Sequence, residues 1–272
     1  MSAVAESAAG AAPSAARTDE RVTQGNVLRS EWTKLWSLRS TRWSLLAAVV
    51  AMAGLGMLIA AVRIGHEHRA FDPINNGVAG YHLAQLAIGV LGVLVISGEY
   101  ATGMIRSSFM AVPHRLPVLW AKALVFAAVT FALMLVSSFV SFFGVQAILS
   151  QNHNQASLSD PHALRVVVGT ALFLTILGVL AVGIGGLVRS TAGGIAVFVG
   201  LLFVLPGITA LLPSSVGDSI TPYLPINAGL AVATSTFDNT HHLAPWAGFA
   251  VFCGYAAIAM AAAAAGLIRR DA

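Results

Sequence analysis

Charged side chains are scarce in this sequence. Only 10% of the 272 residues are Asp, Glu, Lys or Arg, 57% are hydrophobic, and the mean hydropathy is +0.80. A soluble globular domain carries about 25% charged residues, because its surface faces water. So few charges cannot cover a water-facing surface, and we therefore predict that most of the chain faces lipid.

Cysteine is nearly absent as well. The single cysteine, Cys253, lies in an apolar run, which excludes an intramolecular disulfide and a metal site built from cysteines. His66, His68 and the pair His241–His242 lie in polar stretches, where histidines are usually solvated, so we expect no metal site.

The chain also lacks the sequence motifs of nucleotide-binding and hydrolytic enzymes. It has no G-x-x-x-x-G-K-[ST] phosphate loop, no G-x-S-x-G and no H-E-x-x-H. We therefore expect that the chain is not an enzyme and holds no cofactor of its own.

Six apolar runs are present instead. Five lie near the roughly 20 residues that a membrane-spanning helix needs, and the run 118–150 is longer than needed. They are continuous, without the period-two alternation of barrel strands. The sequence therefore predicts an all-α integral membrane protein. The predicted spans are residues 43–62, 80–97, 118–150, 164–188, 191–212 and 246–268.

Two different segments precede the first span. Residues 1–23 are rich in Ala and Ser and predict a disordered cytoplasmic tail. In residues 24–42, Trp32 and Leu35 recur at helical spacing, while Arg29 and Lys34 interleave with them. This pattern predicts an amphipathic helix that lies in the headgroup layer, although packing on another protein surface would produce the same pattern.

The distribution of Lys and Arg predicts the orientation. With the N-terminus in the cytoplasm, twelve of the fifteen basic residues fall on the cytoplasmic side, and only Arg63, Arg69 and Arg165 fall outside. Positive residues concentrate on the cytoplasmic side of membrane proteins. We therefore expect both termini in the cytoplasm, which an even number of spans allows. Between the fifth and sixth spans, the apolar stretch 226–234 is too short to cross and predicts a short re-entrant or interfacial helix.

The segment 98–122 joins the second and third spans and contains charged residues and prolines between two apolar runs. It contains Glu99, Arg106 and Lys122, and it has prolines at Pro113 and Pro117. A short helix within 97–113, stopped by Pro113, would transmit a push to both neighbouring spans, whereas an ordinary loop would only satisfy the charge bias.

Polar residues inside the spans offer few candidates for a substrate path. His82 and Gln85 lie three residues apart on one face of the second span, and Gln146 lies in the third. They could line a path, but hydrogen bonding between helices is the more common role of such groups. No charged residue falls in the middle of a span, which argues against an ion-coupled carrier.

Four stretches resemble the six-span permease subunits of ABC-2 type transporters in their bacterial form. They are SEWTKLWSLRSTRWSL (30–45), GEYATGMIRSSFMAVPHRLPVLWAKAL (98–124), GIGGLVRSTAGGIAVFVGLLFVLP (183–206) and YLPINAG (223–229). The resemblance covers nearly the whole chain beyond residue 23, and the second stretch is its most specific part.

The resemblance implies a function and a set of partners. Such a permease moves a substrate, by export in our prediction, across the cell (plasma) membrane. A separate ATP-binding subunit, which carries the ATP and Mg, drives this movement. A second permease copy, identical or paralogous, completes the usual assembly. The alternative is a membrane anchor or sensor of a resistance or signalling complex that recruits an ATPase without transporting.

The resemblance also assigns parts of the chain. It places an interfacial helix near 30–42, a coupling helix for the ATPase within 98–115 and short extracellular re-entrant helices within 213–245. The coupling residues that it implies are Gly98, Glu99, Tyr100, Thr102, Gly103 and Arg106.

Overall fold

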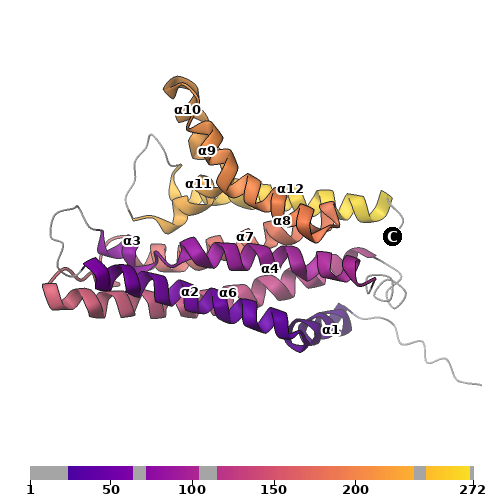
Figure 1. Cartoon of the computed structure of the whole chain (residues 1–272), viewed down its shortest axis with the longest axis horizontal. Coiled ribbons are helices and arrows are strands. Elements are labelled where there is room, and N and C mark those ends of the chain that lie inside the picture. Colours follow the sequence, from indigo (N-terminus) through magenta and orange to yellow (C-terminus); the bar gives the residue numbers. More distant parts are fainter. Residues whose placement is uncertain (1–23, 64–71, 104–114, 236–242, 270–272) are drawn as a thin grey trace, which may run out of the picture.

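The computed structural model describes residues 24–63, 72–103, 115–235 and 243–269. Within these ranges the chain is helical, with no strand (Figure 1). The longer helices are α1 (Gln24–Ser37), α2 (Arg39–Arg63), α4 (Tyr81–Ala101), α6 (Arg115–Leu149), α7 (Ala163–Val188), α8 (Thr191–Val199) and α12 (Pro245–Arg269). Five-to-seven-residue helices are α3 (Pro73–Gly77), α9 (Leu205–Thr209), α10 (Ser214–Ile220) and α11 (Pro225–Leu230).

Six helical segments among the described residues are long and apolar enough to span a membrane, which confirms the predicted number. They are Arg39–Val62, Tyr81–Ala101, Leu116–Leu149, Ala163–Val188, Thr191–Thr209 and Pro245–Arg269. Each overlaps one predicted run and differs from it by a few residues at the ends, because a long apolar stretch locates a spanning helix but does not define its first and last residues. The chain is therefore an all-α protein of the multi-pass membrane type.

Helix α7 forms the centre of the bundle. It packs against α4, α6 and α12, and most of its residues are buried. Small residues make these approaches close: a Cβ atom added at Gly92 of α4 would lie 2.7 Å from the carbonyl oxygen of Gly178 in α7. Contacts of this kind let membrane helices pack without large side chains between their backbones.

The tightest backbone approach involves Gly80, which caps the start of α4 against α2. A Cβ atom there would lie 1.8 Å from the Met52 carbonyl oxygen, and backbone cannot move aside as a flexible side chain can. We expect Gly80→Ala to destabilise the protein by about 1–3 kcal/mol or more, the usual cost of overpacking. Thermal unfolding in detergent measures this. Gly54→Ala is the matched control, since nothing lies within 4 Å of a Cβ at Gly54. Equal melting temperatures for the two variants would contradict the expectation.

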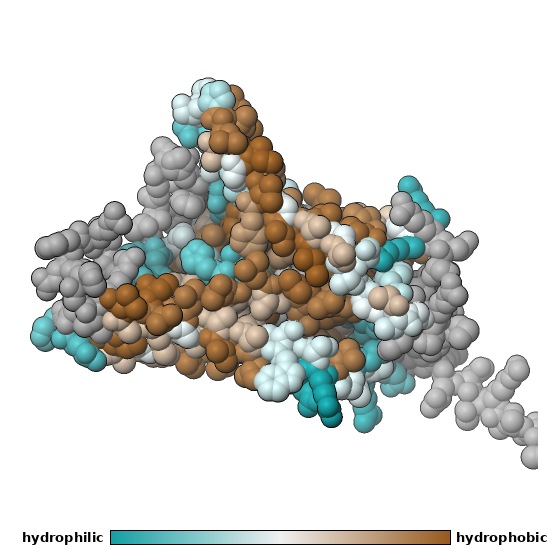
Figure 2. Space-filling model, in the orientation of Figure 1, coloured by the Kyte–Doolittle hydropathy of each residue, from teal (hydrophilic) through white to brown (hydrophobic). Residues whose placement is uncertain are grey.

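The fifth span leans away from the bundle and projects beyond it (Figure 1). It consists of α8, a π-helical turn η2 (Gly200–Val204) and α9. Pro206 has no N–H to donate to the preceding turn, and a widened turn next to it is a common response. Figure 2 shows hydrophobic residues along this projecting helix. Ile208 is 54% exposed, and nothing lies within 4 Å of a Cβ added at Gly200 or Gly207.

Short helices fill the connection between α9 and α12. The predicted helix at 226–234 is present as α11, followed by the 3-10 turn η4 (Ala231–Ala233). Helix α11 packs on α12, and η4 packs on α7, where the Arg165 guanidinium donates to the Val232 carbonyl at 3.2 Å. Helix α10 and the 3-10 turn η3 (Thr221–Tyr223) also lie within 213–245, where the resemblance implied short helices, although the residue pattern did not place them.

The amphipathic segment is shorter than predicted. Helix α1 ends at Ser37, Leu38 breaks the helix, and α2 begins at Arg39, so 39–42 belong to the first span rather than to the interfacial helix. Helix α1 lies at the same end of the bundle as the C-terminal end of α12 (Figure 1). This placement agrees with an even number of crossings.

Candidate functional site

The last turn of α4 carries most of the residues that the resemblance singled out. The helix ends at Ala101, where the Thr102 N–H donates to the Gly98 carbonyl at 3.1 Å and the Thr102 hydroxyl donates to the same oxygen. Gly103 follows with φ +72°, a left-handed conformation that glycine adopts without strain and that commonly ends helices. Residues 98–101 are therefore the end of the second span and not the start of a separate short helix.

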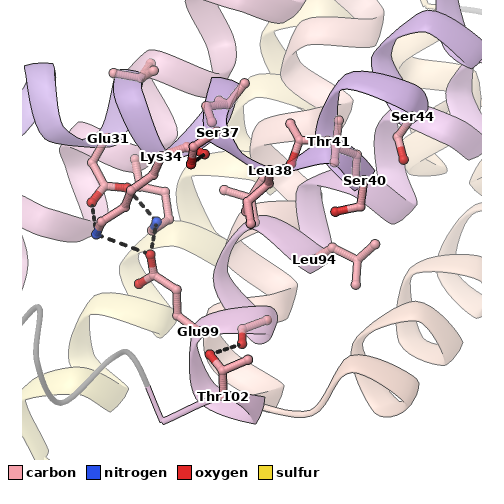
Figure 3. Close-up of a pocket in the computed structure, with 16 residues that line it drawn as sticks. Glu31, Lys34, Ser37, Leu38, Ser40, Thr41, Ser44, Leu94, Glu99 and Thr102 are labelled. Carbon is pink, nitrogen blue, oxygen red and sulfur yellow. Dashed lines mark hydrogen bonds and ion pairs between the residues drawn. The ribbon is translucent and has the colours of Figure 1, made fainter.

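A cluster of four charged side chains joins α1, α4 and α6. We call Glu31, Lys34, Glu99 and Lys122 the ion cluster (Figure 3). The Lys122 ammonium lies 2.5 Å from Glu31 Oε2 and 2.8 Å from Glu99 Oε1. The Lys34 ammonium lies 2.7 Å from Glu31 Oε1 and 3.4 Å from Glu99 Oε1. Two carboxylates and two ammonium groups make the cluster neutral overall.

Three members of the ion cluster are buried. The side chains of Glu31, Lys122 and Glu99 are 4%, 5% and 9% exposed, whereas Lys34 is 31% exposed. Removing charges from water is costly, and the cost is recovered only when each charge is paired and hydrogen-bonded. The cluster therefore holds α1 against the ends of two spans in a defined arrangement, because each partner requires the others.

Pairing controls the protonation of the two α1 residues. Burial by itself would raise the pKa of Glu31, but its pairing with Lys122 and Lys34 outweighs burial and holds the pKa below the ordinary 4.5. Burial by itself would lower the pKa of Lys34, but its pairing with Glu31 and Glu99 raises the pKa above the ordinary 10.5. Both residues therefore stay charged at neutral pH.

These shifts predict how stability depends on pH. A lowered carboxyl pKa stabilises the fold above pH 4.5, and this contribution is lost as the pH falls through the folded-state pKa. A raised lysine pKa stabilises the fold below pH 10.5, and this contribution is lost as the pH rises through the folded-state pKa. We expect the contribution of Glu31 and Lys34 to the melting temperature to be flat between these limits and to fall on both sides. The double variant Glu31→Gln, Lys34→Gln is the control, and an identical pH profile for this variant would contradict the assignment.

The neighbouring residues connect the same turn of α4 to the other side of the bundle. The Tyr100 ring lies 5.4 Å from the Arg189 guanidinium, which donates to the Gly266 carbonyl of α12 at 2.7 Å. The Ser97 and Thr191 hydroxyls lie 3.0 Å apart and link α4 to α8. One helical turn thus contacts α1, α6 and α8, and reaches the ends of α7 and α12 through Arg189.

Arg106 lies outside the described residues, together with the remainder of the predicted helix within 97–113. Gly98, Glu99, Tyr100, Thr102 and Gly103 lie within them, and the structure brings these residues together at the end of α4.

The three candidate substrate-path residues make different hydrogen bonds, and Gln146 has other partners than His82 and Gln85. Gln146 uses both ends of its amide: it donates to the Pro73 carbonyl at 2.9 Å and accepts from the Ala156 N–H at 2.8 Å. Gln85 is buried and donates to the His82 carbonyl within its own helix at 3.3 Å. The His82 side chain is exposed beside Tyr81. Gln146 therefore links α3 to the connection after α6. Among the described residues, no side-chain hydrogen bond joins His82 or Gln85 to another helix, which was the alternative to a substrate path.

Sequence reasoning missed Glu31 and Arg189 as members of this region. Glu31 falls at i+4 between Val27 and Leu35, the buried face of α1, and such a placement requires a cation opposite it. That cation is Lys122. The available signal was that Lys122 and Glu99 lie at the adjacent ends of consecutive spans, where a charged cluster can form. Among the described residues, no group of three or more His, Cys, Asp or Glu side chains could hold a metal ion.

No protein-family model matches the chain, and no curated protein matches it either.

Proposed function

We propose that the chain is the permease subunit of an ATP-binding-cassette transporter of the ABC-2 type. A separate ATP-binding subunit, which holds the ATP and Mg, drives it, and a second permease copy completes the assembly. In this proposal the chain lies in the cell membrane with both termini in the cytoplasm and exports its substrate. The short helices between α9 and α12 then lie on the extracellular side.

The observation that carries the proposal is the connectivity at the end of α4. The segment 104–114 joins α4 to α6, and its two flanking helices are joined a second time by the ion cluster. A force applied to that segment would reach α1 through Glu31, α8 through Ser97, and the ends of α7 and α12 through Tyr100 and Arg189. An anchor that only recruits a partner would not need one contact point to reach so many spans.

Cysteine labelling tests the location of the 104–114 segment. In a Cys253→Ala background, we expect Ser107→Cys in intact cells to be protected from a membrane-impermeant maleimide. Ser215→Cys, on exposed α10, is the control and should react. In the purified complex, Ser107→Cys should cross-link to the ATP-binding subunit. Labelling of Ser107→Cys from outside, or cross-linking of the ATPase only to other parts of the chain, would refute the proposal.

A further inference from the structure

The ion cluster forms one end of a cavity of about 340 Å³ between α1, α2, α4 and α6 (Figure 3). This volume lies at the lower end of the range for sites that hold small molecules. Its walls differ in chemistry. Leu91, Leu94 and Val95 of α4 form an apolar wall, while Ser40, Thr41 and Ser44 of α2 contribute a row of hydroxyl groups.

Glu99, at the charged end of the cavity, has one oxygen that the ion cluster does not use. Oε1 accepts from both lysines, whereas Oε2 is buried and has no hydrogen-bond partner among the described residues. In Figure 3 this second oxygen has no dashed line. A buried carboxylate oxygen without a donor is costly, so the site favours a ligand that brings one.

The cavity lies at the level where lipid headgroups are expected. Four exposed tryptophans lie on α1 and near the starts of α2 and α6, the helices that line the cavity. Tryptophan concentrates at membrane–water interfaces. The four are Trp32 and Trp36 of α1, Trp43 of α2 and Trp120 of α6. Leu91 precedes Glu99 by eight residues, roughly 12 Å along the helix toward the middle of the span. An amphiphile with its head at Glu99 would therefore have its chain beside Leu94 and Leu91.

We propose that this cavity binds a primary-amine amphiphile, whose ammonium group donates to Glu99 Oε2 as the carboxylate turns toward it. Its aliphatic chain lies along the apolar wall, and its ester or phosphate oxygens meet the α2 hydroxyls. An ethanolamine phospholipid and a free alkylamine both have this chemistry. The site goes beyond the proposed function and does not depend on the ATPase.

Gly98 offers a way to fill the cavity without altering a charge. It lines the cavity, and a Cβ atom added there meets nothing within 4 Å. Gly98→Leu should occupy the space of the ligand. Leu94→Trp is a second blocking variant, in which a larger side chain replaces one that already lines the cavity. Gly54→Leu is the matched control, because it adds the same side chain to an open position of α2 that does not line the cavity.

The experiment uses the purified full chain. Native mass spectrometry compares phosphatidylethanolamine with phosphatidylcholine, and thermal shift compares dodecylamine with dodecyltrimethylammonium, which has no N–H to donate. We expect both amines to bind, the quaternary analogues to bind weakly, and Gly98→Leu and Leu94→Trp to weaken amine binding by at least roughly tenfold while Gly54→Leu does not.

The outcomes separate the sources of the ligand. Binding of dodecylamine without phosphatidylethanolamine would support the site and assign it to a free amine. Equal binding of the quaternary analogues would overturn the role of Glu99 as acceptor. No binding of either amine, or binding that survives both blocking variants, would overturn the site itself.

Discussion

Replacing Lys122 with methionine will lower the free energy of unfolding by about 3–5 kcal/mol, the usual cost of breaking a buried ion pair. Lys122 contacts both carboxylates of the ion cluster and is 5% exposed. Its removal leaves Glu31 and Glu99 with Lys34 as their shared cation and gives the cluster a net negative charge. Chemical or thermal unfolding in detergent measures the loss.

Two further variants make this prediction specific to charge pairing. Arg42→Met removes an exposed cation from α2 and should cost about 0–1 kcal/mol, as surface charges do. The double variant Glu99→Leu, Lys122→Met removes one charge of each sign and leaves the Glu31–Lys34 pair at 2.7 Å. It should be more stable than Lys122→Met alone. If the second substitution lowers stability further, Lys122 acts by packing and not by pairing.

Arg106→Ala will leave the complex assembled but reduce the ATP-driven movement of the spans on the order of tenfold. A charged hydrogen bond is worth about 1.5–3 kcal/mol, and about 1.4 kcal/mol corresponds to a tenfold change in an equilibrium. This prediction follows from the proposed function, in which the 104–114 segment receives the force. The readout needs no knowledge of the substrate. Spin labels at Ser215→Cys in both permease copies, in a Cys253→Ala background, report the distance between the two α10 helices with and without ATP.

Arg269→Ala is the control for the loss of a cation from the same chain, since Arg269 is exposed at the end of α12. It should change the ATP-dependent distance little. If Arg106→Ala shows the full ATP-dependent change while the ATPase remains bound, coupling does not depend on Arg106. If the ATPase dissociates, Arg106 contributes to assembly and the prediction of selective uncoupling is wrong.

The sequence predicted the spans well and the site only in part. Each span is a long apolar run, and a membrane helix must satisfy its backbone hydrogen bonds within itself, so a local pattern was sufficient. The end of α1 was placed five residues too far along, because Arg39 and Arg42 continue the basic pattern of α1 and residues 38–42 do not mark the break at Leu38. The π turn beside Pro206 also left only a weak local signal.

The sequence by itself determined that this chain is built from six apolar helices, because composition and run length decide what can face lipid. Only the tertiary structure decided that Glu31, Glu99 and Lys122 share one buried site, since they come from three helices and their residue numbers are 23 to 91 apart. The same holds for the connection of Tyr100 through Arg189 to α12. Apolar periodicity tells which face of a helix is buried, but which charges meet there depends on how the helices pack.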